Sequence, residues 1–163
     1  MSNKTVLAIA VLGVACMTAA TAQAKSDKDF LTDAIKGDNS EIMLGNLAAD
    51  KGGSKDVRSF GDTLATDHGK AKQQAAAVAR RMNVPVTDQM TDEARQGQKK
   101  LQGMSGAEFD KEFANYMVSD HKKDISEFED EAKSGKGSVA KLAKMTLPTL
   151  RKHLHIAQSL QKG

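Results

Sequence analysis

The stretch Phe60–His68 reads FGDTLATDH, and the stretch Phe113–His121 reads FANYMVSDH. The two stretches match at the leading phenylalanine, at a large apolar residue four positions on, and at the closing Asp-His pair. Apolar residues three and four positions apart form one face of an α-helix, so each stretch predicts a core-facing helix that carries a histidine. We expect these two helices to be parallel neighbours with both histidines at the same level.

Four long helical segments are expected around these stretches. Ser54 is a predicted N-cap, Ser105 with Glu108 forms a predicted capping box, and Pro148 predicts a kink or a helix restart near Thr146. The segments are separated by Gly52-Gly53, by Asn83-Val84-Pro85 and by Ser134-Gly135-Lys136-Gly137. The expected helices cover residues 27–50, 55–82, 106–133 and 138 to the C-terminus, with a short polar helix begun at Thr87 or Thr91 in the connection 86–104.

The lengths of the connections predict the topology. The first and last links are short, so each joins two helices into an antiparallel hairpin, whereas the connection 86–104 is long enough to cross the bundle. The chain is therefore expected to be all-α, a ferritin-like four-helix bundle with a long crossover that contains a short helix. The alternative that the pattern leaves open is a simple up-down bundle. Residues 25–163 suit one domain.

The first 24 residues have the pattern of a secretory signal peptide. Lys4 is followed by the apolar run 6–20, and Ala22-Gln23-Ala24 forms a cleavage motif. The run is too short to span a membrane. We therefore expect a periplasmic or secreted protein, and the alternative is a lipoprotein anchored through Cys16.

Composition excludes several kinds of function. Cys16 is the only cysteine, so a chain without the signal peptide has no disulfide and no thiolate metal site. The formal net charge is +3, and the two signs are interspersed along the chain, which argues against nucleic-acid binding. No segment predicts a membrane span.

Three of the four histidines are expected to point into the bundle. At 100° per residue, His68, His121 and His153 lie on the apolar stripes of three different helices, and His155 faces solvent. Glu41 lies on the corresponding stripe of the first helix. Counting 1.5 Å per residue from the short turns brings these four side chains to similar heights near the middle of the bundle.

Three imidazoles and one carboxylate form a complete shell for a tetrahedral transition-metal ion such as Zn, Cu or Fe. Asp67 and Asp120 each precede an inward histidine and are expected to accept a hydrogen bond from a ring N–H on a neighbouring helix. The alternative is a structural network in which these buried polar groups bond to one another without a metal.

Catalysis finds little support in the sequence, so we expect no enzyme. Di-iron bundles use Glu-x-x-His motifs, but the residues three positions before the inward histidines are Ala65, Val118 and Leu150. A metal-dependent oxidase is therefore the least favoured function.

The chain resembles a bacterial family of domains of unknown function in the ferritin-like superfamily, often labelled as outer-membrane or exported proteins. The resemblance covers residues 25–160 and implies a ferritin-like bundle and export, but no established activity. It is carried by the two Asp-His pairs together with Glu41–Gly45, Phe128–Ala132, Leu147–Leu150 and His153-Leu154.

The expected function is transition-metal binding in the bundle core, in the service of metal handling or envelope stress. The alternative is a non-enzymatic interaction or stress-protective protein, whose inward histidines form a structural or pH-responsive network.

Overall fold

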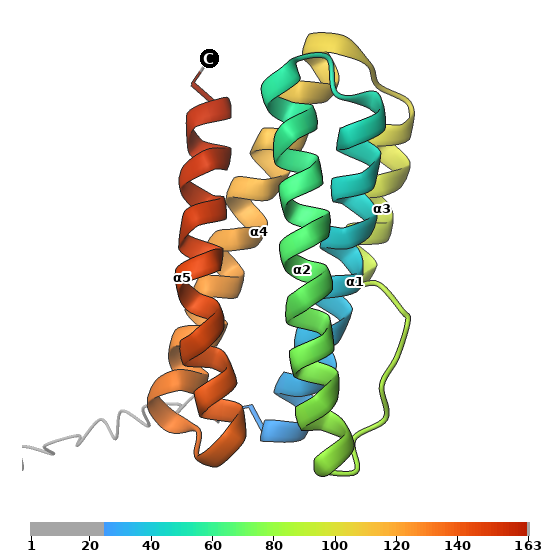
Figure 1. The fold of residues 1–163 in the computed structure, drawn as a ribbon. Helices are drawn as coiled ribbons and strands as arrows, with labels where there is room; N and C mark the ends of the chain where they lie inside the picture. The colour runs from blue at the N-terminus through green and yellow to red at the C-terminus, as the bar shows by residue number, and fades with distance from the viewer. Residues whose placement is uncertain (1–24, 163) are drawn as a thin grey trace, which may run out of the picture.

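The computed structural model describes residues 25–162, which form five α-helices. Four of them are long and make up a bundle, and the short α3 (Asp92–Gln102) lies along one side of it (Figure 1). The long helices are α1 (Asp27–Lys51), α2 (Lys55–Arg81), α4 (Gly106–Ser134) and α5 (Gly137–Leu160). The expected signal peptide 1–24, including Cys16, lies outside the described residues. Within those described, no helix is long and apolar enough to cross a membrane.

The helices are arranged as two antiparallel hairpins. α1 packs mainly on α2 and α4 mainly on α5, and the connection through α3 returns the chain along the bundle, so that α2 and α4 run in the same direction (Figure 1). This confirms the predicted ferritin-like bundle with a long crossover and excludes the up-down alternative. The expectation that the two Asp-His helices are neighbours was wrong, because α2 packs on α1 and α5 and faces α4 diagonally across the bundle.

The helix starts predicted after Ser54, Thr91 and Ser105 are confirmed, but the capping box predicted at Ser105 is absent. Ser54 Oγ accepts a hydrogen bond from the Val57 amide, and Thr91 Oγ1 accepts one from the Ala94 amide, so the crossover helix begins after Thr91 rather than Thr87. The side chain of Ser105 makes no capping bond. Gly106 enters α4 with a φ of +57°, a left-handed turn that replaces the predicted capping box.

α5 continues through Pro148 without the expected restart near Thr146. A proline inside a helix deprives the carbonyl four residues earlier of its partner, which here is that of Lys144. Both Lys144 and Pro148 lie on the exposed side of α5, so water can satisfy this carbonyl. Thr146 is buried and its hydroxyl donates to the carbonyl of Leu142 at 3.0 Å.

Glycines bring α1 and α2 unusually close together. A Cβ on Gly61 would lie 2.5 Å from the carbonyl oxygen of Gly45, and a Cβ on Gly45 would lie 2.7 Å from the carbonyl oxygen of Gly61. Neither distance can accommodate a side chain. The two backbones therefore touch directly at this crossing, close to the level of Glu41 on α1.

Two apolar clusters fill the ends of the bundle, with a polar layer between them. One cluster is built around Phe60, Phe109 and Phe113, and the other around Phe30 and Ile35. Along each long helix, at least one buried polar residue lies between the two clusters. In this layer, dispersion and the hydrophobic effect are replaced by interactions between ionisable groups.

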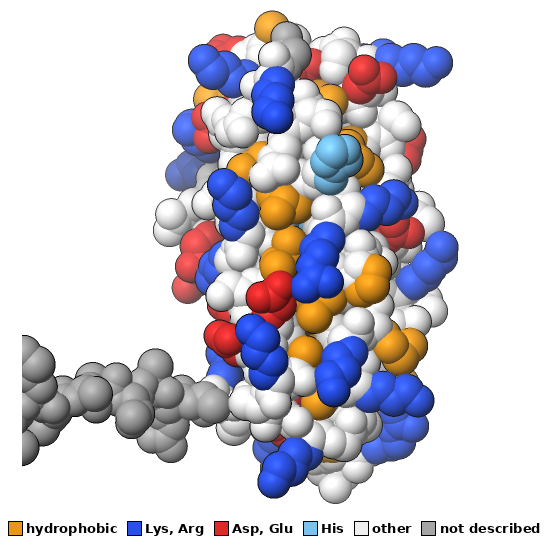
Figure 2. Space-filling view, turned by 90° about the vertical axis from the view of Figure 1, so that its left-hand side faces the viewer, with side chains coloured by type: hydrophobic (Ala, Val, Ile, Leu, Met, Phe, Trp, Pro, Cys, Tyr) orange, Lys and Arg blue, Asp and Glu red, His pale blue; other side chains and the backbone are white. Residues whose placement is uncertain are grey.

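The surface carries charges of both signs. Figure 2 shows the face on the left of Figure 1, where Lys and Arg side chains are scattered beside Asp and Glu, with an interrupted column of hydrophobic side chains between them. Among the described residues, the large exposed apolar side chains are Met43, Val86 and Met145.

Candidate metal centre

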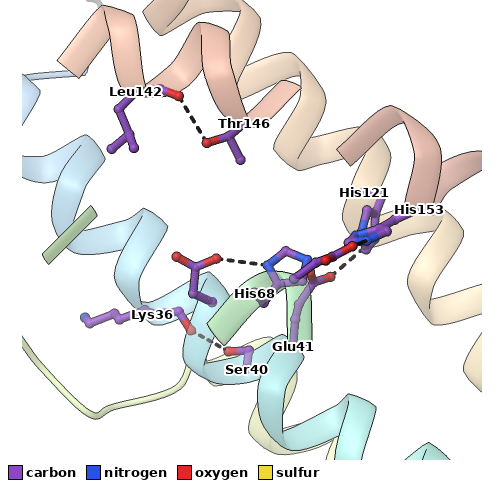
Figure 3. A network of polar contacts seen from close by, with 10 residues as sticks. Lys36, Ser40, Glu41, His68, His121, Leu142, Thr146 and His153 are labelled. Carbon is purple, nitrogen blue, oxygen red and sulfur yellow. Dashed lines mark hydrogen bonds and ion pairs between the residues drawn. The ribbon is translucent and has the colours of Figure 1, made fainter. Parts of the chain in front are cut away.

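Four ionisable side chains meet in the polar layer, one from each long helix (Figure 3). Glu41, His121 and His153 are completely buried, and His68 is 3% exposed. Each offers a nitrogen or oxygen atom, and these atoms all lie within 4.8 Å of one another. The structure thus brings together the residues that the helical stripes singled out.

Each imidazole is held by a hydrogen bond from one of its ring nitrogens. Nδ1 of His121 lies 3.1 Å from the carbonyl oxygen of Met117, which can only accept, so this nitrogen carries the proton. Nδ1 of His68 donates to Asp38 at 2.9 Å, and Nε2 of His153 donates to Asp67 at 3.1 Å. These bonds fix the orientation of the three rings.

The opposite ring nitrogens point into the cluster. Nε2 of His121 and Nδ1 of His153 are buried without a hydrogen-bond partner, whereas Nε2 of His68 meets the carboxylate of Glu41. Such groups are costly to leave unsatisfied. A hydrogen bond on one ring nitrogen and a free lone pair on the other is the arrangement found in histidine metal ligands.

The carboxylate of Glu41 contacts two of the rings. Nε2 of His68 is in direct contact with Oε2 of Glu41, and Nδ1 of His121 lies 3.2 Å from Oε1 of the same residue. Burial alone would raise the pKa of Glu41, but its interactions with the rings of His121 and His68 outweigh burial and hold that pKa below its usual value. The pKa of His68 is raised well above its usual value, since the charge on Glu41 and the hydrogen bond to Asp38 outweigh burial.

The other two rings are held neutral. Burial lowers the pKa of His121, and burial lowers the pKa of His153 to about 4 against the opposing hydrogen bond to Asp67. Neutral imidazole is the form that binds metals. At neutral pH the cluster therefore presents two neutral rings together with an ion pair formed by His68 and Glu41.

The cluster can hold a metal ion. Zinc lies about 2.0–2.1 Å from its nitrogen ligands, so neighbouring corners of a tetrahedral shell are about 3.3 Å apart. To reach that spacing, the atoms that lie farther apart, up to 4.8 Å, would move inward, whereas Nε2 of His68 and Oε2 of Glu41, which are in direct contact, would move apart. The donor set of three imidazoles and one carboxylate suits Zn, Cu or Fe.

Asp67 and Asp120, which the sequence predicts to accept hydrogen bonds from the histidine rings, have different surroundings. Asp67 contacts the ring of His153 on α5, as described above. No hydrogen bond or ion pair within residues 25–162 joins Asp120 to a histidine, so that part of the expectation was wrong. Asp120 instead lies beside Glu41 and Asp124, because its position on α4 directs it toward α1.

Sequence reasoning missed Asp38 and Asp124. Asp38 lies one turn before Glu41, and Asp124 lies one turn after His121, so both spacings place a carboxylate near the predicted cluster. This spacing was the available signal. The hydrogen bond between His121 and the Met117 carbonyl could not be predicted from the sequence, because every residue has such a carbonyl group.

The fold and the cluster together define a class: an all-helical bundle protein with a buried histidine and carboxylate centre. A family model described as a domain of unknown function (DUF4142) matches residues 14–160, and the chain belongs to that family. A search of the curated proteins found no match.

A solved structure supports the fold. The chain is similar to the crystal structure of a DUF305 fragment from Deinococcus radiodurans, with a TM-score of 0.74 and 15% sequence identity. The match covers 85% of this chain and 97% of the other. At this identity the likeness concerns the fold alone.

Proposed function

We propose that this protein binds one transition-metal ion, Zn, Cu or Fe, through Glu41, His68, His121 and His153. The observation that carries the proposal is the buried meeting of the Glu41 carboxylate with three rings that are each anchored through one nitrogen, two of which keep a buried nitrogen without a hydrogen-bond partner. Four helices orient these donors toward one point. The proposed role is metal handling or envelope stress in an extracytoplasmic compartment, in a protein related to the ferritin-like superfamily.

Elemental analysis of protein purified without an affinity tag tests the metal site. We expect about one equivalent of a single metal per chain, lost when His68, His121 and His153 are all replaced by alanine. The matched control is His155→Ala, because His155 is exposed on the same helix as His153 and two residues away. Metal that is retained by the triple variant, or lost equally in the control, contradicts the proposed ligands.

The contact between His68 and Glu41 favours a second candidate function. A buried ion pair of this kind is stable without a metal when its remaining groups are satisfied. In this case the protein is a non-enzymatic interaction or stress-protective protein with a structural or pH-responsive network. It would then contain no metal when purified, and its melting temperature would not change on addition of Zn, Cu or Fe.

Export is a separate part of the proposal and rests on the sequence of residues 1–24. The mass of the protein isolated from its native compartment tests it. Processing after Ala24 gives a chain that begins at Lys25, whereas lipidation gives a heavier chain that begins at a modified Cys16.

A further inference from the structure

We propose that metal ions enter and leave the buried centre along the seam between α1 and α4, and that Gly37, which has no side chain, keeps this passage open. The inference rests on the proposed function, because it concerns how the same centre is filled and emptied. A route is needed, since the four proposed ligands are buried and no more than 3% of any of them is exposed.

Two adjoining cavities lie along this seam. The outer one, of about 770 Å³, is lined by α1, the crossover and α4, and the inner one, of about 30 Å³, borders the ring of His68 and its partner Asp38. Gly37 and Asp124 line both cavities, so the outer one leads to the inner one. A water molecule needs about 10–15 Å³ of such space, so the inner cavity can hold a water molecule or a metal ion in transit.

Gly37 leaves open a position that a side chain could fill. It lies one turn before Glu41 on the same stripe of α1, and a Cβ at Gly37 would have nothing within 4 Å. Gly45 and Gly61 differ, because their lack of a Cβ lets two backbones touch. Glycine is less favourable than alanine inside a helix, and no close contact accounts for it at position 37. What it provides there is open space beside the centre.

The charges along the passage change toward the centre. The outer cavity has acids and bases on its walls, and the bases are Lys25, Lys36, Arg95 and Lys123. Among the described residues, no lysine or arginine lines the inner cavity, whose charged walls besides the ring of His68 are Asp33, Asp38, Asp124 and Glu127. A cation that passes the outer cavity therefore moves toward carboxylates, which favours inward movement.

A passage controls rates and leaves affinity unchanged. Entry and exit cross the same barrier, so a side chain that narrows the passage lowers both rate constants by the same factor. The dissociation constant, which is their ratio, then stays the same. A substitution that damages the ligands instead weakens the affinity, so the two effects can be told apart.

Stopped-flow mixing of metal-free protein with Zn²⁺ and a fluorescent zinc indicator measures association, and transfer of bound zinc to saturating EDTA measures release. We expect Gly37→Leu to slow both steps by about tenfold or more, with a dissociation constant within about twofold of the wild-type value by calorimetry. Gly37→Ala adds a methyl group that meets nothing within 4 Å, so it should fold even if the leucine variant does not. It should slow both steps by about threefold.

The matched controls are Gly69→Leu and Gly69→Ala. Nothing lies within 4 Å of a Cβ at Gly69 either, and this residue follows His68 directly but lines neither cavity. Both controls should keep the wild-type rates. Rates that are unchanged in the Gly37 variants, or that fall equally in the Gly69 variants, overturn the passage and leave the metal site intact.

Two further outcomes have distinct meanings. Slower association with unchanged release in Gly37→Leu means a weaker affinity, which overturns the passage because the substitution then acts on the centre itself. Wild-type protein that binds no zinc at all overturns the proposed function, and the passage with it.

Discussion

At the residue scale, the geometry of the centre depends on which of the two ring nitrogens of each histidine forms the anchoring hydrogen bond. His68 and His121 are anchored through Nδ1, and His153 is anchored through Nε2. The anchoring groups are two carboxylates and one backbone carbonyl. Because all three accept hydrogen bonds, each fixes the orientation of its ring, and the neutral rings of His121 and His153 keep a lone pair on the other nitrogen.

The neutral state of His153 predicts a pH dependence in metal-free protein. Its pKa is lowered to about 4, so between that pH and its ordinary value near 6.5 the unfolded chain binds a proton that the folded chain does not. The free energy of unfolding should therefore fall as the pH drops through this window, by roughly 3 kcal/mol from this group.

Urea denaturation at pH 7 and pH 4.5 measures this effect. His153→Gln keeps a polar group near Asp67 but does not titrate, so its stability should change less between the two pH values. The raised pKa of His68 acts in the opposite direction in both proteins. Equal losses of stability in wild type and variant would show that His153 is not held neutral.

Asp38 should act as a positioning residue for His68. Asp38→Asn removes the negative charge that holds the Nδ1 proton, and we expect zinc affinity to fall about 10- to 100-fold. Isothermal titration calorimetry measures this loss. Asp33→Asn is the matched control, since Asp33 lies on the same helix and pairs with Lys25 at the surface. A similar loss in both variants would indicate a general charge effect.

Much of the candidate site was predictable from the sequence, for physical reasons. Helical periodicity fixes which face a side chain is on, and rise per residue fixes its height, so the inward direction of His68, His121 and His153 could be inferred. Hydrogen-bond partners depend on side-chain rotamers and on which helices are neighbours. The contact between Asp120 and Glu41 follows from the packing of α4 against α1, which periodicity does not determine.

At the element scale, the contact between α1 and α2 depends on glycine. Gly61→Ala should destabilise the protein by about 2 kcal/mol or more, although alanine favours helix, because the new Cβ would overlap the backbone of α1. Gly69→Ala is the matched control on the same helix, since nothing lies within 4 Å of its Cβ.

Thermal denaturation should show opposite effects of the two substitutions. Gly69→Ala is expected to raise stability by up to about 1 kcal/mol through helix propensity alone. Gly61→Ala should also weaken zinc binding, because separating α1 from α2 moves Glu41 away from His68. A stable Gly61→Ala variant would mean that the helices can separate at little cost.

Helix boundaries were predictable where a single residue determines them. The hydroxyls of Ser54 and Thr91 cap their helices by local hydrogen bonds, which sequence indicates directly. The start of α4 after Ser105 was predicted as well, but the predicted capping box is not formed there, and Gly106 instead pairs with the distant Gly52. The effect of Pro148 depends on which side of α5 faces water, and local sequence rules do not include that information.

At the scale of the whole molecule, the four proposed ligands connect both hairpins. α1 and α2 supply Glu41 and His68, and α4 and α5 supply His121 and His153. A bound ion would hold the hairpins together, and the unfolded chain has no preformed site. Binding should therefore stabilise the folded state specifically.

Zinc at a hundredfold excess over its dissociation constant should stabilise the protein by about 2.7 kcal/mol. For a domain of this size, that corresponds to a rise of roughly 10 °C in melting temperature. Differential scanning calorimetry measures the shift, and His153→Ala should reduce it strongly, whereas His155→Ala should not. An unchanged melting temperature in the wild type would favour the metal-free network.

Asp110, near the start of α4, accepts hydrogen bonds from the backbone amides of Gly53 and Ser54 at 2.7 and 2.8 Å. These bonds tie the second hairpin to the turn of the first and fix the axial position of α4. One inserted residue between Asp110 and His121 would rotate the histidine by about 100° and shift it by about 1.5 Å. Natural variation in chain length should therefore be tolerated in the crossover loop before Thr91 but be absent from the segment between Asp110 and His121.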